Sequence, residues 1–191
     1  MFTLHDSIFT SSVLELPRVR HAFSTRLGGV STDSATRSMN VAPGHGDTPE
    51  QIYENISILA GRVGVRAEDT VCTHQIHSSL VCYAGDGMRG RGVVSENPDG
   101  FYTDVPGVAL MIRTADCAPI LLGGLRADGT PAVCALHAGW RGSCAAIAWY
   151  GCAALGCLGV EAADIFAAVG PCAHAERFEV GEDMRDTAAA S

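Results

Sequence analysis

The stretch that decides the fold runs from Pro131 to Ser143 and reads PAVCALHAGWRGS. Residues 132–136 form an apolar run with the length and composition of a buried strand, and the run ends at His137. A turn with two glycines follows, and the apolar, small-residue segment 144–158 predicts a buried helix. This order places an imidazole at the carboxyl end of a strand, where the sites of α/β proteins form.

The turn after His137 also carries groups that attract anions. Its free backbone N–H groups and the guanidinium of Arg141 lie in one short segment, and such a segment before a helix predicts an anion site. A second interpretation fits this stretch equally well. In it, the strand, turn and helix are only packing elements, and the histidine is hydrogen-bonded in the core.

Length and composition bound the class of protein. With 191 residues, 47% of them hydrophobic, the chain predicts a single domain with a sizeable core. The net charge of −8 and the absence of a basic run argue against nucleic acid or an anionic membrane as partner. No signal peptide is recognisable, and no stretch reaches the about 18 apolar residues of a membrane span. The eight cysteines include no CxxC pair, which argues against a zinc ribbon. Because the chain is long, has no visible export signal and carries several cysteines in apolar runs, most of them are expected to be reduced in a cytoplasmic protein.

Short apolar runs alternate with turns along the rest of the chain. Thr48, Pro49 and Gln51 predict a capped helix start, and Gly61 and Gly64 are expected to end that helix. Strands outnumber helices and several connections are too short for βαβ crossovers, which favours an α+β fold with mixed sheets. The other expected elements are strands at 80–83, 101–103, 108–112, 120–122 and 164–169, a hairpin turn at Asp128-Gly129 and an exposed loop at 85–99.

Three side chains at strand ends or interruptions suggest chemistry, namely His77, Cys117 and His137. One thiolate and two imidazoles are a known ligand set for zinc, with the fourth position left to water or substrate. Such a metal lowers the pKa of bound water toward about 7. The same residues allow a metal-free interpretation, with Cys117 as nucleophile and His137 as base. Each residue is also consistent with a buried cysteine or a satisfied core histidine.

Three neighbouring features refine this picture. His74 lies three residues before His77, so on a strand the two would face opposite sides and at most one would enter a site. Pro119 cannot donate to a sheet ladder, so Asp116 and Cys117 are expected at an irregular, exposed junction between two apolar runs. The loop at 24–31 combines an arginine, two glycines and several hydroxyls, which suits either a phosphate contact or a plain surface turn.

Two other chemistries lack their motifs. Pro171-Cys172 is similar to the PCxxC of zinc nucleobase deaminases, but residue 175 is alanine and no HxE precedes it. Oxidation at a multicopper cluster requires several His-x-His pairs, which this sequence does not contain, although one cysteine and two histidines can hold a single copper ion.

Ten landmarks follow one another along the chain between Phe23 and Met184. They are FSTRLGGVS at 23–31, MNV at 39–41, GD at 46–47, EN at 54–55, QIH at 75–77, DG at 99–100, TADCAP at 114–119, HAGWRG at 137–142, GPC at 170–172 and FEVG at 178–181. With these landmarks the chain resembles a bacterial family whose members are called multicopper polyphenol oxidoreductases or laccase-domain proteins. The same family carries the names purine nucleoside phosphorylase and peptidoglycan editing factor.

The resemblance implies a layered α/β/β/α structure of the α+β class, similar to the catalytic domain of a deamidating bacterial toxin that uses Cys and His. It implies a zinc site whose ligands fall on His77, Cys117 and His137. The implied activities are phosphorolysis of adenosine, inosine, guanosine and methylthioadenosine, and deamination of adenosine. The family continues past residue 191 with another helix and strand. Residues 1–191 are therefore expected to be one domain that lacks the family's C-terminal elements.

The function expected from the sequence is that of a zinc-dependent purine nucleoside phosphorylase that also deaminates adenosine. Its partners would be the small-molecule nucleoside and phosphate. The metal ligands Cys117 and His137 are also expected to act in catalysis, together with Asp116. Arg26 and Arg141 are expected against phosphate, and Asn40 against substrate. Three alternatives stay open: a Cys117/His137 hydrolase, an editing enzyme for a cell-wall precursor, and a polyphenol oxidase with copper in place of zinc.

Overall fold

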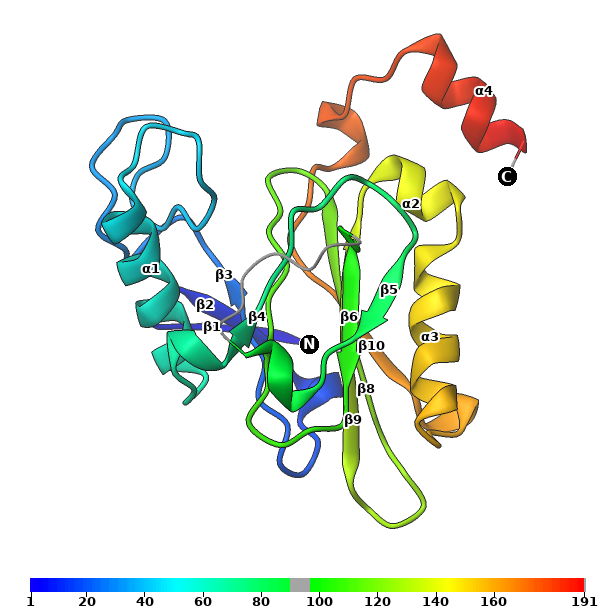
Figure 1. Cartoon of the computed structure of the whole chain (residues 1–191). Coiled ribbons are helices and arrows are strands. Elements are labelled where there is room, and N and C mark those ends of the chain that lie inside the picture. The colour runs from blue at the N-terminus through cyan, green and yellow to red at the C-terminus, as the bar shows by residue number, and fades with distance from the viewer. Residues whose placement is uncertain (90–96, 191) are drawn as a thin grey trace.

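The computed structural model describes residues 1–89 and 97–190 (Figure 1). The strands are β1 (Phe2–His5), β2 (Ile8–Ser11), β3 (Phe23–Ser24), β4 (Thr70–Val71), β5 (Val81–Tyr83), β6 (Gly100–Thr103), β7 (Ala109–Leu110), β8 (Ala118–Leu125), β9 (Pro131–Ala138) and β10 (Phe166–Val169). The helices are α1 (Pro49–Arg62), α2 (Trp140–Cys144), α3 (Ile147–Cys157) and α4 (Glu182–Ala190). The fold is α+β with mixed sheets, as predicted from the sequence.

A five-stranded sheet in the order β10-β8-β9-β6-β5 forms the centre of the molecule. Its strands pair antiparallel except for β5 and β6, which are parallel. The two longest strands, β8 and β9, pair along their whole length through the turn at Asp128-Gly129 that the sequence predicted. Leu122, Leu136 and Leu155 are among the buried residues of the core between this sheet and α3.

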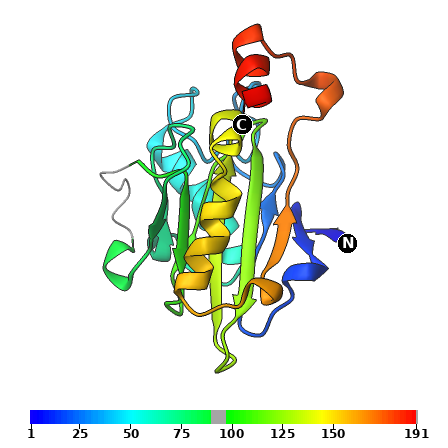
Figure 2. The same ribbon diagram turned by 90° about the vertical axis from the view of Figure 1, so that its right-hand side faces the viewer.

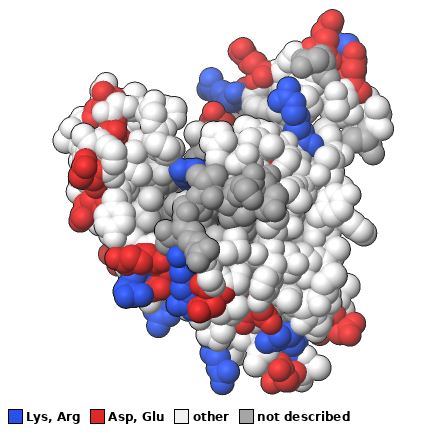
Figure 3. Space-filling model, in the orientation of Figure 1, with Lys and Arg blue, Asp and Glu red and all other residues white. Residues whose placement is uncertain are grey.

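Helix α3 covers one face of the central sheet, as Figure 2 shows. Residues 142–160 carry no charged side chain, and the flank over α3 is correspondingly white in Figure 3. The predicted buried helix 144–158 is wrong in two respects. Only one face of α3 is buried, at Ile147, Gly151 and Leu155, whereas Trp149 is 64% exposed. The helix is also interrupted, because α2 ends at Cys144 and α3 begins at Ile147. Ala146 breaks it with a left-handed φ of 60°. The break could not be predicted, because the residue in this conformation is an alanine and not one of the usual helix breakers, glycine or proline.

The opposite side of the sheet faces a second layer of short strands. β1, β2 and β3 form an antiparallel sheet, and β4 pairs with β7 in parallel. Helix α1 lies on the outer flank of this layer, so the order across the molecule is helix, sheet, sheet, helix (Figure 1). The helix begins at the predicted place: Thr48 accepts from the amide of Gln51, and the Gln51 side chain accepts from the Thr48 amide.

Several predicted boundaries differ from the structure. The expected strand 108–112 is reduced to the two residues of β7, while β8 begins directly after Cys117 and includes Pro119 in its ladder. The expected exposed loop 85–99 is partly outside the described residues, at 90–96. The prediction of exposure is wrong at the end of this loop, because Pro98 and Asp99 are buried. None of the helices in the described ranges is long and apolar enough to cross a membrane.

Asn55 ties the long loop after β3 to helix α1. Its side chain is fully buried; the carbonyl oxygen accepts from the amide of Val30, and the amide nitrogen donates to the Ser31 hydroxyl and the Asn40 carbonyl. A buried polar side chain with all of these partners orders the loop. The same groups become costly to bury once the side chain is removed.

We expect Asn55→Ala to lower the free energy of unfolding by about 2–4 kcal/mol, because it removes three hydrogen bonds of a fully buried side chain and leaves the buried Ser31 hydroxyl without this partner. Urea denaturation followed by circular dichroism measures the change. Glu54→Ala, at an exposed position of the same helix, should change the free energy by less than about 0.5 kcal/mol. Equal effects of the two substitutions would show that the loop is not held by Asn55.

Candidate metal centre

The register of β8 and β9 brings two distant residues of the site together. In this antiparallel ladder Pro119 lies opposite His137 and Ala118 lies opposite Ala138. Cys117, the residue before β8, is therefore next to the end of β9 that carries His137. The strand-end histidine and the cysteine at the irregular junction meet because eight residue pairs fix the register.

His77 reaches the same point from a segment without regular structure between β4 and β5. Its Nε2 lies 3.6 Å from the sulfur of Cys117, and its ring packs edge-on against the ring of His137 with centroids 4.7 Å apart. One ligand atom from each of the three side chains lies within 4.8 Å of the others. His74, by contrast, is exposed, so only one histidine of this pair enters the cluster.

The distance between Cys117 and His77 fits a tetrahedral metal ion. Bonds of about 2.3 Å to sulfur and about 2.0–2.1 Å to nitrogen, at the tetrahedral angle, separate the two ligand atoms by about 3.6 Å. The observed distance between Cys117 Sγ and His77 Nε2 is 3.6 Å. A soft sulfur with two imidazole nitrogens suits zinc or copper, and three protein ligands leave one position open.

Asp99 lies directly behind the cluster and is fully buried. Its Oδ1 is 2.7 Å from His137 Nδ1 and accepts from the amide of His77 at 2.9 Å. Its Oδ2 accepts from the amides of Ile76 and Ser78 and from the Ser78 hydroxyl. One carboxylate thus contacts one candidate ligand by its ring and the other by its backbone. No role for Asp99 was predicted from the sequence. The Asp99-Gly100 pair was one of the ten landmarks of the family resemblance, but its local composition placed Asp99 at the end of an exposed loop.

The segment after β9, which leads into α2, needs glycine at two positions. A Cβ at Gly139 would lie 2.4 Å from Cδ2 of His77, and one at Gly142 would lie 2.6 Å from the backbone oxygen of Ser78. Both glycines therefore allow the turn to pack against the His77 segment. His77 itself adopts a left-handed φ of 62°, which is uncommon for a residue with a Cβ and is typical of functional sites.

The charges around the cluster act on its thiol and its carboxylate. Burial raises the pKa of the Cys117 thiol, and the negative charges of Asp116 and Asp99 raise it further. Burial also acts to raise the pKa of Asp99, but the hydrogen bonds from His137, Ser78 and Ile76 outweigh it and hold that pKa below its usual value. The thiol alone is therefore a poor nucleophile at neutral pH, whereas a metal ion would favour its ionised form.

The remaining residues predicted for the site lie around it at different places. Asp116 is exposed beside Cys117 and has a φ of 124°. Arg141 is exposed in α2, with its guanidinium carbon 4.2 Å from the centre of the Trp140 ring. Asn40 uses its side chain within its own loop, where it bonds to both backbone groups of Ala42 and to Asp47.

A cavity of about 1280 Å³ separates the two layers. Arg26 and Asn40 line it from the loop after β3, and Thr114 and Ala115 line it from the junction that leads to Cys117. The cavity therefore extends from the two predicted substrate residues to within a few residues of a metal ligand. Sequence analysis missed Arg113, which also lines it; its backbone exchanges two hydrogen bonds with the Gln75 side chain.

Comparison with known proteins identifies the family. The sequence profile described as multi-copper polyphenol oxidoreductase laccase matches residues 20–191. The chain belongs to this laccase-like family. The resemblance seen in the sequence is thus confirmed, and the family includes proteins that carry the name purine nucleoside phosphorylase.

Two curated relatives of the family illustrate the similarity. A purine nucleoside phosphorylase of Deinococcus radiodurans is 37% identical over 166 residues, which cover 87% of this chain and 61% of the relative. One of Corynebacterium glutamicum is 35% identical and is matched over 87% of this chain and 65% of its own length. The chain thus spans less than two thirds of the length of these relatives.

Solved structures show the same laccase-like fold. YlmD from Geobacillus stearothermophilus superposes with a TM-score of 0.83 at 26% identity, over 97% of this chain and 70% of that protein. Protein NMB0706 of Neisseria meningitidis gives a TM-score of 0.73 at 32% identity, over 88% of this chain and 64% of its own.

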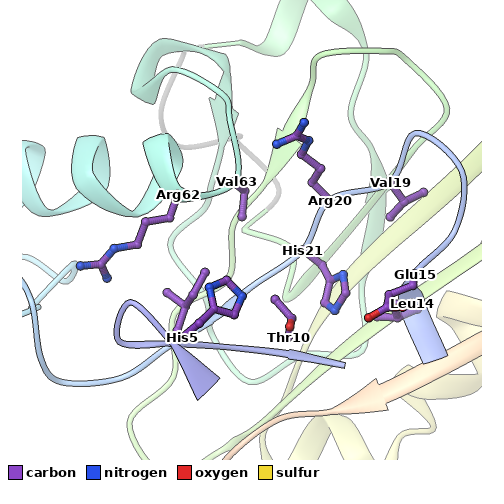
Figure 4. A pocket seen from close by; sticks show the side chains of 10 residues that line it. His5, Thr10, Leu14, Glu15, Val19, Arg20, His21, Arg62 and Val63 are labelled. Carbon is purple, nitrogen blue, oxygen red and sulfur yellow. The ribbon is translucent and has the colours of Figure 1, made fainter. Parts of the chain in front are cut away.

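A smaller pocket of about 280 Å³ lies in the N-terminal layer of this laccase-like chain, away from the three candidate ligands (Figure 4). The rings of His5 and His21 flank Thr10 in it. The Nε2 of His21 accepts from the amide of Ser11, and burial lowers the pKa of this ring although the charge of Glu15 opposes it.

We expect Gly139→Ala to weaken metal binding by about 10–100-fold, because the added methyl group displaces the His77 ring. Competition with a chromophoric zinc chelator measures the affinity. The matched control is Gly156→Ala, since a Cβ at this position of α3 meets open space. An unchanged affinity in Gly139→Ala would mean that the ring of His77 does not hold the metal.

A second expectation concerns acid stability. Since the pKa of His21 is lower in the folded than in the unfolded chain, the unfolded chain binds more protons as the pH falls below the ordinary value of 6.5. The free energy of unfolding should therefore decrease between about pH 7 and pH 5, and His21→Gln should reduce that decrease. Urea titrations at several pH values measure it, with His5→Gln at the exposed end of the same pocket as control.

Proposed function

We propose that the protein is a zinc-dependent purine nucleoside phosphorylase. The observation that supports this most directly is the cluster of His77, Cys117 and His137. Its donor atoms are of the types that zinc prefers, and the spacing of the Cys117 and His77 atoms matches two zinc ligands. The family and the names of the similar curated proteins favour the nucleoside substrate. Adenosine, inosine, guanosine and methylthioadenosine are the substrates proposed, and deamination of adenosine is proposed as a second reaction.

The reaction needs groups that position phosphate and nucleoside beside the cluster. In phosphorolysis a phosphate oxygen bonds to the ribose C1′, the bond from C1′ to the purine nitrogen breaks, and the base leaves with a proton. Zinc held by the cluster would polarise water or a substrate group. Arg26 on the cavity wall and Arg141 in α2, the short helix after β9, are proposed to bind phosphate, and Asn40 to lie near the nucleoside.

Asp116 is proposed to move a proton next to Cys117. Its side chain is exposed to solvent at the junction before β8, and its charge acts on the Cys117 thiol. A carboxylate in this place can take up and release a proton without being buried.

One other function is favoured by a specific contact. The sequence suggested a hydrolase with Cys117 as nucleophile and His137 as base, but the contact in the structure involves the other histidine. The Cys117 sulfur lies 3.6 Å from Nε2 of His77, which is the arrangement of a nucleophile and its base in a cysteine hydrolase. The raised pKa of the Cys117 thiol speaks against it, because a cysteine nucleophile needs a lowered one. The hydrolase, acting on a nucleoside or a cell-wall precursor, is therefore the alternative that the experiment must separate.

The test combines metal content with turnover. Purified protein should contain a single zinc ion per chain by mass spectrometry and should convert adenosine to adenine and ribose 1-phosphate only when phosphate is added. Cys117→Ala should lose both zinc and turnover, whereas Cys157→Ala, at an exposed position of α3, should keep both. If Cys117→Ala retains zinc and full turnover, the proposal is wrong.

Further arms distinguish the alternatives. Inosine formed without phosphate would show deamination. A protein that is inactivated by iodoacetamide and indifferent to chelators would be a cysteine hydrolase. Copper in place of zinc, with oxidation of a phenol, would support the oxidase suggested by the family's description.

A further inference from the structure

We propose that Asp99 is the positioning residue of the metal centre. Through one buried carboxylate it holds the His137 ring with the proton on Nδ1, which leaves Nε2 free to bind the metal, and it clamps the backbone that carries His77. The proposal rests on the metal-binding part of the proposed function and is independent of the reaction that the centre serves.

The hydrogen bonds around Asp99 define what each of its oxygens does. Oδ2 receives two amides and a hydroxyl, those of Ile76 and Ser78. Oδ1 receives the amide of His77 and faces His137 Nδ1 at 2.7 Å. Because backbone amides can only donate, both oxygens act as acceptors, and the ring nitrogen that faces Oδ1 is the donor.

Burial makes this tautomer choice strong. Asp99 is 0% and His137 4% exposed, so water does not compete for the bond between them. The proton on Nδ1 leaves the Nε2 lone pair as the one nitrogen of the ring that can bind a metal. Without a fixed acceptor at Nδ1, a neutral imidazole distributes its proton over both nitrogens and part of the protein cannot bind metal.

The same carboxylate also fixes the second histidine, by a different route. His77 has a left-handed φ of 62°, and the amides of residues 76, 77 and 78 all turn toward Asp99. This backbone conformation is unfavourable for histidine unless surrounding contacts hold it. Hydrogen bonds from three backbone amides to the buried Asp99 carboxylate supply those contacts. The Asp99 side chain therefore sets the positions of both His77 and His137.

Asp99→Asn tests the proposal because an amide cannot reproduce both sets of bonds. An amide nitrogen placed at Oδ2 would face two backbone donors, whereas at Oδ1 it would face only the amide of His77 and the His137 ring. The second orientation costs less. In that orientation the tautomer of His137 is reversed, because Nδ1 must then accept a hydrogen bond and the ring proton moves to Nε2.

The experiment reads the tautomer of His137 by ¹⁵N nuclear magnetic resonance of the histidine rings in metal-free protein. The wild type should show protonated Nδ1 and unprotonated Nε2, and Asp99→Asn the reverse. Zinc affinity, measured by chelator competition, should fall by about 10–100-fold in Asp99→Asn. Ser78→Ala removes only one of the hydrogen bonds to Asp99, that of the hydroxyl to Oδ2, together with the bond that this hydroxyl accepts from the Leu80 amide. It should keep the wild-type tautomer.

A wild-type ring protonated on Nε2 would overturn the proposal, and so would a folded Asp99→Asn protein with unchanged tautomer and unchanged zinc affinity. If Asp99→Asn does not fold, the ring spectra of the wild type and of Ser78→Ala test the proposal. Both should show His137 protonated on Nδ1, and protonation on Nε2 would overturn it. A correct tautomer in protein without phosphorylase activity would support the positioning role and count against the proposed reaction, so the two failures can be told apart.

Discussion

The antiparallel ladder between β8 and β9 is the constraint on which the rest of the site depends. Its register sets Pro119 opposite His137, and thereby sets Cys117 beside the end of β9. Side chains alternate across a strand, so a shift by one residue would turn His137 to the other face of the sheet. The apolar residues of β9 that pack under α3 oppose such a shift, because they would have to face the cavity side. Core packing and site geometry are therefore fixed by the same pairing.

A second layer of constraint is polar and lies behind the ladder. Asp99 precedes β6, and β6 pairs with β9 so that Gly100 lies opposite Leu136. That pairing delivers the carboxylate to His137. A buried charge is costly unless it is hydrogen-bonded, and here five hydrogen bonds meet it. These bonds hold the pKa of Asp99 down in spite of its burial. The hydrogen bonds thus offset the cost of burying the carboxylate, and they also order a segment that has no regular structure.

The sequence predicts those parts of the molecule whose signals are local. The capped start of α1 depends on four adjacent residues, Thr48 to Gln51, and the strand that ends at His137 depends on one apolar run. The convergence of the three metal-binding candidates could be proposed only from residue types and family resemblance. Strand pairing brings Cys117 beside His137, and His77, 40 residues before Cys117, reaches the same point from a segment without regular structure. Asp99 was missed because its burial results from the pairing of β5, β6 and β9, which a Gly- and charge-rich stretch does not reveal. The break at Ala146 was missed because only tertiary packing forces an alanine into that conformation.

The way the three side chains are held determines what a metal can add to this protein. In small zinc domains the ligands come together only when the metal binds, so the binding free energy serves as folding free energy. In this chain, contacts without metal already hold the ligands: a strand register for Cys117 and His137, a buried carboxylate for His137 and His77, and a close backbone approach at Gly139. Little ordering is left for the metal to induce. Its binding free energy then remains available for affinity and for the open fourth position, which is the arrangement expected of a catalytic centre rather than a structural one.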